Sequence, residues 1–286
     1  MNDKTLIVIE GPTAVGKTAF AIDMALQYRT EIISADSRQF YKELNIGVAR
    51  PSEAELAIVK HHFVAHISVM DYYSVSKFEQ DVLTLLETLF ETHATVVMVG
   101  GSGLYVNAVC HGIDELPDPD PKLRAEIASL YEQEGLEACQ NKLLQLDPVF
   151  YRQIDLANHK RVLRAIEVCL QTGKPYSQLR TSTKKQRPFH IQRIALNRDK
   201  TNLYQRIDQR VDTMIAVGLI NEALPLYAHR TLNALNTVGY KELFAYFDGK
   251  ISIEQAITDI KTHSRRYAKR QLTWLNAQEG LQWQLL

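Results

Sequence analysis

Eight residues near the N-terminus have the types and spacing of a phosphate-binding loop. Gly11–Thr18 matches the Walker A pattern G-x-x-x-x-G-K-[ST] at every fixed position. An apolar segment, residues 6–9, precedes the loop and a helical pattern, residues 17–28, follows it, which is the context that this motif requires. There the backbone N–H groups of the loop and of the helix N-terminus converge on an anion. We therefore predict a diphosphate or triphosphate site made by Gly11, Pro12, Thr13, Ala14, Val15, Gly16, Lys17 and Thr18.

Two side chains of this loop add chemistry to the backbone groups. Lys17 brings a mobile positive charge, and Thr18 offers a hydroxyl oxygen to Mg²⁺, which is the one metal contact that we expect. The sequence alone does not say whether the bound phosphates belong to a nucleotide or to another donor.

Asp36 is the first candidate for acid–base chemistry. It follows residues 31–35, which we expect to form a strand adjacent to the loop strand, so its carboxylate can face the phosphates and an acceptor. An Asp at such a place can be a general base, a Mg²⁺ ligand through water, or a helix cap. No acid follows the apolar run at residues 95–99, which ends in Gly100-Gly101. Without a Walker B acid, a motor ATPase or a GTPase is disfavoured, and transfer to a second substrate is favoured.

Alternating strand and helix patterns position these residues. Strands alternating with helices predict an α/β fold with a P-loop NTPase-like parallel sheet covered on both faces, and ligands in such sheets lie beyond the carboxyl ends of the strands. The expected strands are residues 6–9, 31–35, 63–67 and 95–99, and the expected helices are residues 17–28, 52–60 and 76–92.

The pattern changes after residue 111. A proline-punctuated segment, residues 116–121, leads into a stretch that reads as helical over residues 122–179. We predict a core domain of residues 1–111 and 190–286, and a helical insertion domain of residues 112–189. Within the second part of the core we expect a strand at 191–196 that rejoins the sheet, helices at 203–216, 219–227, 240–247 and 253–276, and a short strand at 281–285.

Charge is balanced overall but unevenly distributed. The 33 basic and 33 acidic residues cancel, yet residues 174–193 hold six Lys or Arg and no acid, and residues 261–270 hold five and no acid. Such runs are typical either of a local polyanion-binding surface or of solvated helix faces. On the last long helix we expect Lys261, Arg265 and Lys269 on one stripe, with Arg266, Arg270 and Trp274 on the next. On an earlier helix, Arg206 and Arg210 share a face and could reach a diphosphate, unless Asp208 and Asp212 pair with them.

Composition limits the class of protein. Hydrophobic residues make up 45% of the 286 residues and charged residues 23%, and no apolar run is long enough for a transmembrane helix. Cys110, Cys139 and Cys169 are far apart and read as buried free thiols. We expect a cytoplasmic monomer without a signal peptide and without membrane contact.

Seven segments together resemble the tRNA dimethylallyltransferases, the tRNA isopentenyltransferase family, in its bacterial form. They occur in the family's order and span nearly the whole chain: Gly11–Thr18, Asp36–Tyr41, Gly47–Pro51, Gly100–Tyr105, Arg161–Val168, Val238–Glu242 and Tyr267–Trp274. Arg38 departs from the family's usual small residue, and Lys160 stands at a variable position.

The resemblance implies a reaction. A dimethylallyl group would pass from dimethylallyl diphosphate to the exocyclic amine of the adenosine 3′ of the anticodon in tRNA, with Mg²⁺ as cofactor and diphosphate as leaving group. Asp36 would accept the amine proton, and Thr13 and Arg210 would stabilise the charge on the departing oxygen.

The resemblance also implies a tRNA-binding set, with the insertion domain contacting the anticodon stem-loop. Its residues are Asp36, Ser37, Arg38, Gln39, Ser102, Arg124, Lys160, Arg161, Val162, Leu163, Arg164, Asn236, Thr237, Val238, Gly239, Tyr240, Lys241, Lys269, Arg270, Gln271, Thr273 and Trp274.

Two alternatives stay open at this point. A small-molecule kinase of the shikimate or nucleoside-monophosphate type shares the loop, the Asp and the glycine pair, although such kinases are shorter and lack a helical insertion of this size. A non-catalytic nucleotide-sensing module that binds RNA would have no need of Lys17, Thr18 and Asp36 together.

Overall fold

The computed structural model describes residues 4–181 and 183–286. The chain divides into two compact units, Met1–His111 with Gln186–Leu286, and Gly112–Lys185. The second boundary lies before Gln186, where the sequence pattern had placed it after residue 189. The reason is that Arg187 packs on the first unit, where its guanidinium contacts Glu79 at 2.6 Å and donates to the Val109 carbonyl at 2.8 Å.

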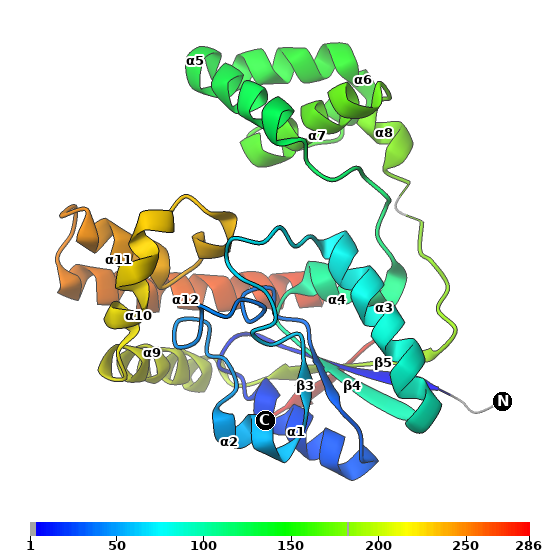
Figure 1. Cartoon of the computed structure of the whole chain (residues 1–286), viewed down its shortest axis with the longest axis vertical. Helices are drawn as coiled ribbons and strands as arrows, with labels where there is room; N and C mark the ends of the chain where they lie inside the picture. The colour runs from blue at the N-terminus through cyan, green and yellow to red at the C-terminus, as the bar shows by residue number, and fades with distance from the viewer. Residues whose placement is uncertain (1–3, 182) are drawn as a thin grey trace. The chain divides into compact units, whose positions relative to one another are not determined.

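In the described part of the first unit, six strands form one all-parallel sheet in the order β3-β2-β4-β1-β5-β6 (Figure 1). The predicted parallel sheet is confirmed, as is the return of the chain to it through β5 and β6. The strands are β1 Thr5–Glu10, β2 Ile32–Ser34, β3 His61–His62, β4 Thr95–Val99, β5 His190–Asn197 and β6 Leu281–Leu285.

Helices cover both faces of the sheet. Alternate residues of β1 point to opposite faces: Ile7 and Ile9 belong to a core shared with α1 and α9, whereas Leu6 and Val8 belong to a core shared with α3 and α4. The helices of this unit are α1 Lys17–Tyr28, α2 Glu53–Ile58, α3 Val75–Thr92, α4 Gly103–His111, α9 Lys200–Ala216, α10 Leu219–Leu226, α11 Tyr240–Phe247 and α12 Ile253–Asn276, with short 3₁₀ turns η1 Tyr227–His229 and η2 Asn233–Leu235.

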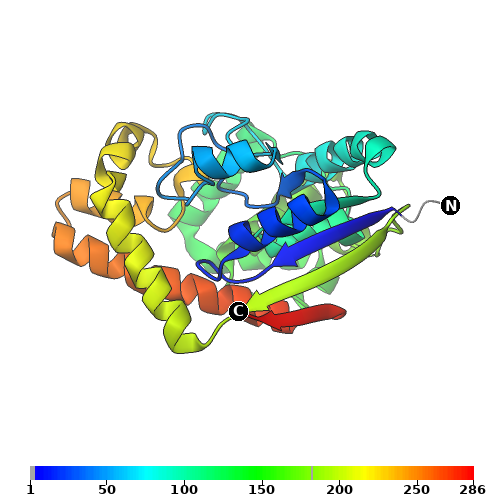
Figure 2. The same ribbon diagram turned by 90° about the horizontal axis from the view of Figure 1, so that it is seen from below.

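The helices α9 to α12 form a group beside the sheet with its own apolar core (Figures 1 and 2). The core is centred on Tyr240, whose side chain is fully buried. The helix α9 begins just after the carboxyl end of β5, and both α9 and α12 contact the loop after β1, through Arg206 and Gln271.

The predicted strand at residues 63–67 is wrong. The strand is His61–His62, and the chain then bends, with positive φ at Phe63 and Ala65. The apolar residues of the segment pack as an aromatic cluster instead of a strand, since Phe63 and His66 both lie edge-on to neighbouring rings. Apolar composition alone could not distinguish the two arrangements.

A second expectation also fails: β2 is not adjacent to β1. β4 lies between them and pairs with both. Asp36 nevertheless ends near the loop, because the Ala35 amide donates to the Val99 carbonyl at 2.7 Å and the Gly100 amide donates to the Ile9 carbonyl at 3.1 Å. The carboxyl ends of the three strands are thereby held in one row.

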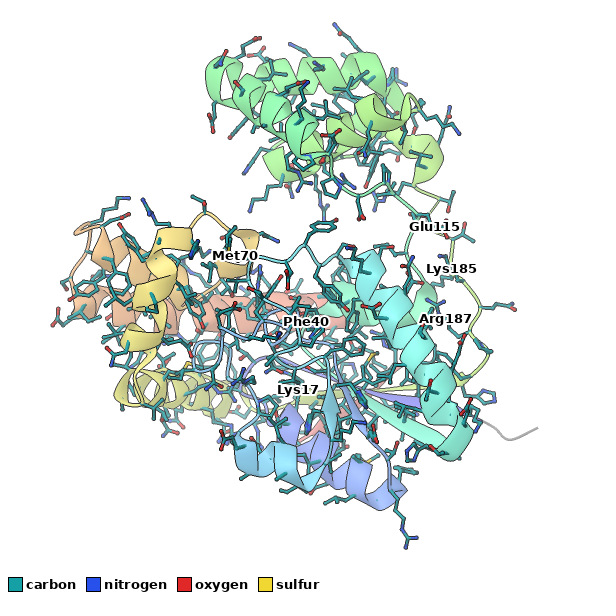
Figure 3. All side chains as sticks on the ribbon, in the orientation of Figure 1. Lys17, Phe40, Met70, Glu115, Lys185 and Arg187 are labelled. Carbon is teal, nitrogen blue, oxygen red and sulfur yellow. The ribbon has the colours of Figure 1, made fainter. Side chains whose placement is uncertain are left out.

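The second unit is helical over most of residues 122–179, as predicted, with non-helical connections at residues 147, 152–158 and 173–175. Its core contains Cys139, Leu143 and Phe150. Asp147 is fully buried and caps α6 through the Phe150 amide at 2.9 Å. At the ends of this unit, Lys185 and Glu115 form an ion pair of 3.4 Å (both labelled in Figure 3). The helices are α5 Pro121–Leu146, kinked at Gly135, α6 Pro148–Tyr151, α7 His159–Thr172 and α8 Tyr176–Leu179.

The three cysteines are buried and free, as expected. No single helix within the described residues has the length and apolarity to cross a membrane, and one bent pair, Lys200–Ala216 with Leu219–His229, reaches the threshold by length and composition only.

Candidate active site

The loop between β1 and α1 has the left-handed backbone that its glycines allow. Gly16 has a φ of 114° and Ala14 a φ of 64°. The Lys17 ammonium (labelled in Figure 3) donates to the carbonyls of Gly11 and Pro12, each at 2.9 Å. Burial lowers the pKa of Lys17 to about 8, opposed by the nearby Asp36 carboxylate. The ammonium is therefore poised over the loop that would hold an anion.

Three arginines surround the loop. Arg206 donates from Nε to the Ala14 carbonyl at 2.9 Å, and Arg198 donates from Nε to the Val15 carbonyl at 2.7 Å. Arg210 reaches the Thr13 hydroxyl at 3.5 Å, and burial together with Arg206 lowers the pKa of its guanidinium. Arg206 and Arg210 therefore both lie against the loop, as a contact with a diphosphate would require.

Gln271 connects the loop to the glycine pair after β4. Its Oε1 accepts from the Thr13 amide at 2.8 Å, and its Nε2 donates to the Gly101 carbonyl at 2.9 Å. The side chain is buried. We had assigned Gln271 to tRNA binding, and the structure places its amide on the phosphate loop.

Asp36 lies beside the loop, and its carboxylate does not cap a helix. Its Oδ1 accepts from the Arg38 amide at 3.1 Å in a local turn. Next to it, the Ser102 hydroxyl donates to Ser37 Oγ at 3.1 Å, so these two members of the predicted tRNA-binding set lie together.

Three cavities lie at the site, and Asp36 lines two of them. The phosphate groove, about 340 Å³, is lined by the loop with Lys17, Thr18, Arg206 and Arg210. The apolar cavity, about 120 Å³, has the aliphatic wall residues Val48, Ile207, Val211, Met214, Val238 and Ile260, and Asp36, Arg38 and Arg210 also line it. The aromatic pocket, about 290 Å³, is lined by polar and ring side chains that include Ser37, Ser102, Tyr105, Arg270 and Trp274.

The cavities share walls at the residues that could do chemistry. Thr13, Asp36 and Arg210 line both the phosphate groove and the apolar cavity. Tyr267 lines all three cavities. We had not assigned Tyr267 to the site. The sequence signals were its place a helical turn before Gln271, on the same face of α12, and its position at the start of the family segment Tyr267–Trp274.

The donor set fits a magnesium ion held by phosphate. Thr18 and Asp36 line the same groove, and Mg²⁺ prefers few protein oxygens together with phosphate oxygens and water. Among residues 4–181 and 183–286, no group of three or more His, Cys, Asp or Glu side chains could hold a metal ion by itself.

The basic stripes of α12 differ from the prediction. Lys261 pairs with Asp212 at 2.6 Å and Arg265 with Asp208 at 2.5 Å. These two basic residues therefore join α12 to α9, and Asp208 and Asp212 do not pair with Arg206 or Arg210. The exposed members of the stripes are Lys269, Arg266, Arg270 and Trp274, and Thr273 is exposed beside them.

Several other predicted RNA contacts hold the fold together. Arg38 donates to the carbonyls of Asn233 and Ala234 at 2.9 and 3.1 Å, and Gln39 donates to those of Val48 and Ala49 at 3.3 and 3.0 Å. Tyr240 is fully buried, so its side chain packs the helical group. Of the segment before and into α11, Asn236 and Lys241 are exposed, Thr237 and Val238 are half-buried, and Gly239 is buried.

In the second unit, Glu167 gathers two of the predicted basic residues. It pairs with Arg124 at 3.0 Å and with Arg164 at 3.1 Å. Lys160 and Arg161 are exposed on α7, Leu163 is half-buried, and Val162 is fully buried in the unit's core. Of the predicted RNA-binding residues on α7, Lys160 and Arg161 are therefore the exposed ones.

Sequence reasoning missed Glu222 of α10. Its carboxylate accepts from the amides of Asn45, Ile46 and Gly47 at 3.1, 2.7 and 2.9 Å, and from the Tyr240 hydroxyl at 2.6 Å. A Cβ on Gly47 would lie 2.7 Å from the Tyr240 ring, so only glycine fits there. Glu222 thereby fixes the segment that walls the apolar cavity, and no local pattern signals this contact.

Sequence reasoning also missed a buried ion pair beside the loop. Arg193 of β5 contacts Glu10 of β1 at 2.6 Å, and both side chains are at most 5% exposed. Burial raises the pKa of the Glu10 carboxyl, opposed by Arg193. Two charged residues within core strands were the available signal.

Known proteins resemble this chain over nearly its whole length. The family model "IPP transferase" matches residues 39–278. A "tRNA dimethylallyltransferase 2" of Azobacteroides pseudotrichonymphae is 51% identical over 280 residues, 98% of this chain and 91% of that protein.

Solved structures of such transferases also resemble this chain. A full-length tRNA isopentenylpyrophosphate transferase from Bacillus halodurans has a TM-score of 0.72 and 36% identity, covering 99% of this chain and 90% of its own. A eukaryotic dimethylallyltransferase acting on tRNA has a TM-score of 0.78 and 27% identity, covering 95% and 70%. These relatives do not favour the kinase alternative, and the P-loop NTPase-like fold class is confirmed.

Proposed function

Because the chain belongs to the IPP transferase family, we propose that it transfers a dimethylallyl group from dimethylallyl diphosphate to the exocyclic amine of the adenosine 3′ of the anticodon in tRNA. The observation that carries the proposal is the meeting of three unlike cavities at Tyr267, with Asp36 lining two of them, the phosphate groove and the apolar cavity. A donor with a charged half and an apolar half, and an acceptor with a ring, need such a junction.

The phosphate groove takes the diphosphate of the donor. Its loop amides, Lys17 and Arg210 surround the space with positive charge. Mg²⁺ bound by the diphosphate and the Thr18 hydroxyl would add a further positive charge against the leaving group. The dimethylallyl chain then lies in the apolar cavity, which shares Thr13 and Arg210 with the groove.

The transfer exchanges one bond for another. The bond between C1 of the donor and the diphosphate oxygen breaks, its electron pair leaves with diphosphate, and a bond forms between C1 and the adenosine amine. Thr13 and Arg210 stabilise the charge that develops on the departing oxygen. The Asp36 carboxylate accepts the amine proton as the new bond makes that nitrogen acidic.

The aromatic pocket suits the acceptor base. Ser37 and Ser102 present hydroxyls there, and Trp274 presents a ring on which a flipped base can stack. The exposed Lys269 and Arg270 lie on α12, which lines this pocket, and the exposed Lys241 lines a further cavity together with Arg270; these cations are suited to RNA phosphates. In the second unit, the exposed Lys160 and Arg161 are the candidates for contacts with RNA phosphates.

One experiment separates the proposal from its rivals. The protein is incubated with dimethylallyl diphosphate and an anticodon stem-loop RNA, with and without Mg²⁺, and digested nucleosides are analysed by mass spectrometry. A dimethylallyl adenosine formed together with diphosphate supports the proposal. Consumption of ATP with phosphorylation of a small acceptor would replace it with the kinase alternative, and RNA binding without product would favour the sensing module.

A further inference from the structure

We propose that Met214, at the end of the apolar cavity, limits the length of the prenyl chain that the enzyme accepts. The inference rests on the proposed function and concerns a residue that the reaction itself does not require. It follows from the way two helices line the cavity.

Along α9, the residues on the face that lines the site change from polar to apolar with increasing distance from the phosphate loop. Arg206 contacts the loop at Ala14, and Arg210, one turn later, contacts it at Thr13. The next turn on this face carries Met214, about 6 Å farther along the axis than Arg210. Met214 lines the apolar cavity and does not line the phosphate groove.

The helix α12 repeats this gradient in the opposite direction. Gln271 contacts the loop amide of Thr13, Tyr267 and Ser264 follow on the same face, and Ile260 comes last. The ion pairs Asp208–Arg265 and Asp212–Lys261 set the two helices antiparallel, so Met214 and Ile260 lie at the same level. These two side chains close the cavity where the polar groups end.

The size of the cavity matches a short chain. It measures about 120 Å³. A dry aliphatic cavity of about 150 Å³ is known to hold benzene, a six-carbon ring. A five-carbon dimethylallyl group therefore fits, and a ten-carbon geranyl group does not fit unless the end of the cavity opens.

Met214 is the side chain whose removal would open it. Ile260 is 2% exposed and belongs to the core of the helical group, whereas Met214 is half-buried and packs at the edge of that core. Truncating Met214 at Cβ thus opens the cavity toward the surface, while truncating Ile260 removes a core side chain and destabilises the fold.

The walls beside Met214 are held in place. Glu222 fixes the segment at Gly47, and Gln39 fixes it at Val48 and Ala49. Moving this segment to make room for a longer prenyl chain would break those hydrogen bonds. The length of chain that fits is therefore set by the flexible side chain of Met214 at the end of the cavity.

The test compares Met214→Ala with the wild-type protein on dimethylallyl and geranyl diphosphate, using anticodon stem-loop RNA and mass spectrometry of the nucleosides. We expect the ratio of kcat/KM for the geranyl donor to that for the dimethylallyl donor to rise at least tenfold. Met24→Ala is the matched control, because Met24 is a half-buried methionine on α1 in a different core. Its ratio should equal that of the wild type.

A second variant guards against loss of folding. Met214→Val keeps an apolar side chain and should give a smaller rise of the same sign. An unchanged ratio in a folded Met214 variant, or efficient use of geranyl diphosphate by the wild-type protein, overturns the inference and leaves the proposed function standing. Failure of the wild-type protein to use dimethylallyl diphosphate would refute the proposed function, and the inference with it.

Discussion

The phosphate groove and the apolar cavity share Thr13, Asp36 and Arg210, yet they are built in opposite ways. The groove is built around one contiguous segment, Gly11–Thr18, whose backbone amides and Lys17 are joined by Arg206 and Arg210 of α9. The cavity takes its walls from distant parts of the chain, near Gly47, along α9, before α11 and along α12. A donor that occupies both gains binding energy from a rigid backbone anion site and from side-chain packing, and these two terms can be separated by experiment.

Asp36 stands where the two meet, and its loss should have the largest effect. Asp36→Ala removes the proton acceptor, so we expect kcat to fall by about 10² to 10⁴. Because the loop amides and the aliphatic walls remain, donor affinity should change little. Single-turnover kinetics with labelled donor measures the first, and equilibrium binding of the donor measures the second. Near-normal turnover would refute the assignment of the base.

Glu222→Gln tests the cavity without touching the groove's charged residues. The variant loses charge-assisted hydrogen bonds to three amides, so the Gly47 segment should loosen and the free energy of unfolding should fall by about 1–3 kcal/mol. The KM for the dimethylallyl donor should rise roughly tenfold, which corresponds to about 1.4 kcal/mol of lost packing. Inhibition by inorganic diphosphate, which uses the groove alone, should change much less.

Glu254→Gln is the control for that variant, since Glu254 is exposed at the start of α12. Equal losses of donor and diphosphate binding in Glu222→Gln would mean that groove and cavity cannot be treated as separate contributions.

The same contrast explains which parts of the site could be predicted from the sequence. The loop, Asp36 and the α9 arginines were predictable because contiguous motifs and helical periodicity report on local structure. The roles of Tyr267, Gln271 and Glu222 were not, since each depends on which distant segments the fold brings together.

The same distinction between local and tertiary features applies to the fold. Helices such as α1, α11 and α12 have the predicted limits, because periodicity and caps are local signals. The position of β4 between β1 and β2, and the bend after β3, depend on tertiary pairing and on aromatic packing.

The pH dependence of donor binding should identify the groove's contribution. The lowered pKa of Lys17, about 8, means that its ammonium in the free enzyme loses its proton as the pH rises through 8. A bound diphosphate favours the charged form, so above pH 8 both the donor KM and the inhibition constant of diphosphate should rise, at most about tenfold per pH unit. Lys17→Arg keeps the positive charge at all these pH values, so the rise of both constants above pH 8 should disappear, although the variant binds the donor more weakly. If the rise persists in Lys17→Arg, the group that loses its proton is not Lys17.

RNA binding should be separable from donor binding in the groove and in the apolar cavity. The two stripes of α12 allow a comparison of two matched double variants. Arg266→Glu with Arg270→Glu removes two exposed cations, whereas Lys261→Glu with Arg265→Glu removes two that already neutralise Asp212 and Asp208. We expect the first pair to weaken binding of an anticodon stem-loop several-fold and to reduce the slope of log K against log salt by about 1 to 2, because fewer phosphate counterions are released. The second pair should lower the melting temperature with little change in that slope, since the cost falls on the contact between α9 and α12. If the second pair flattened the salt dependence as much as the first, the stripe joined to α9 would also have to face the RNA.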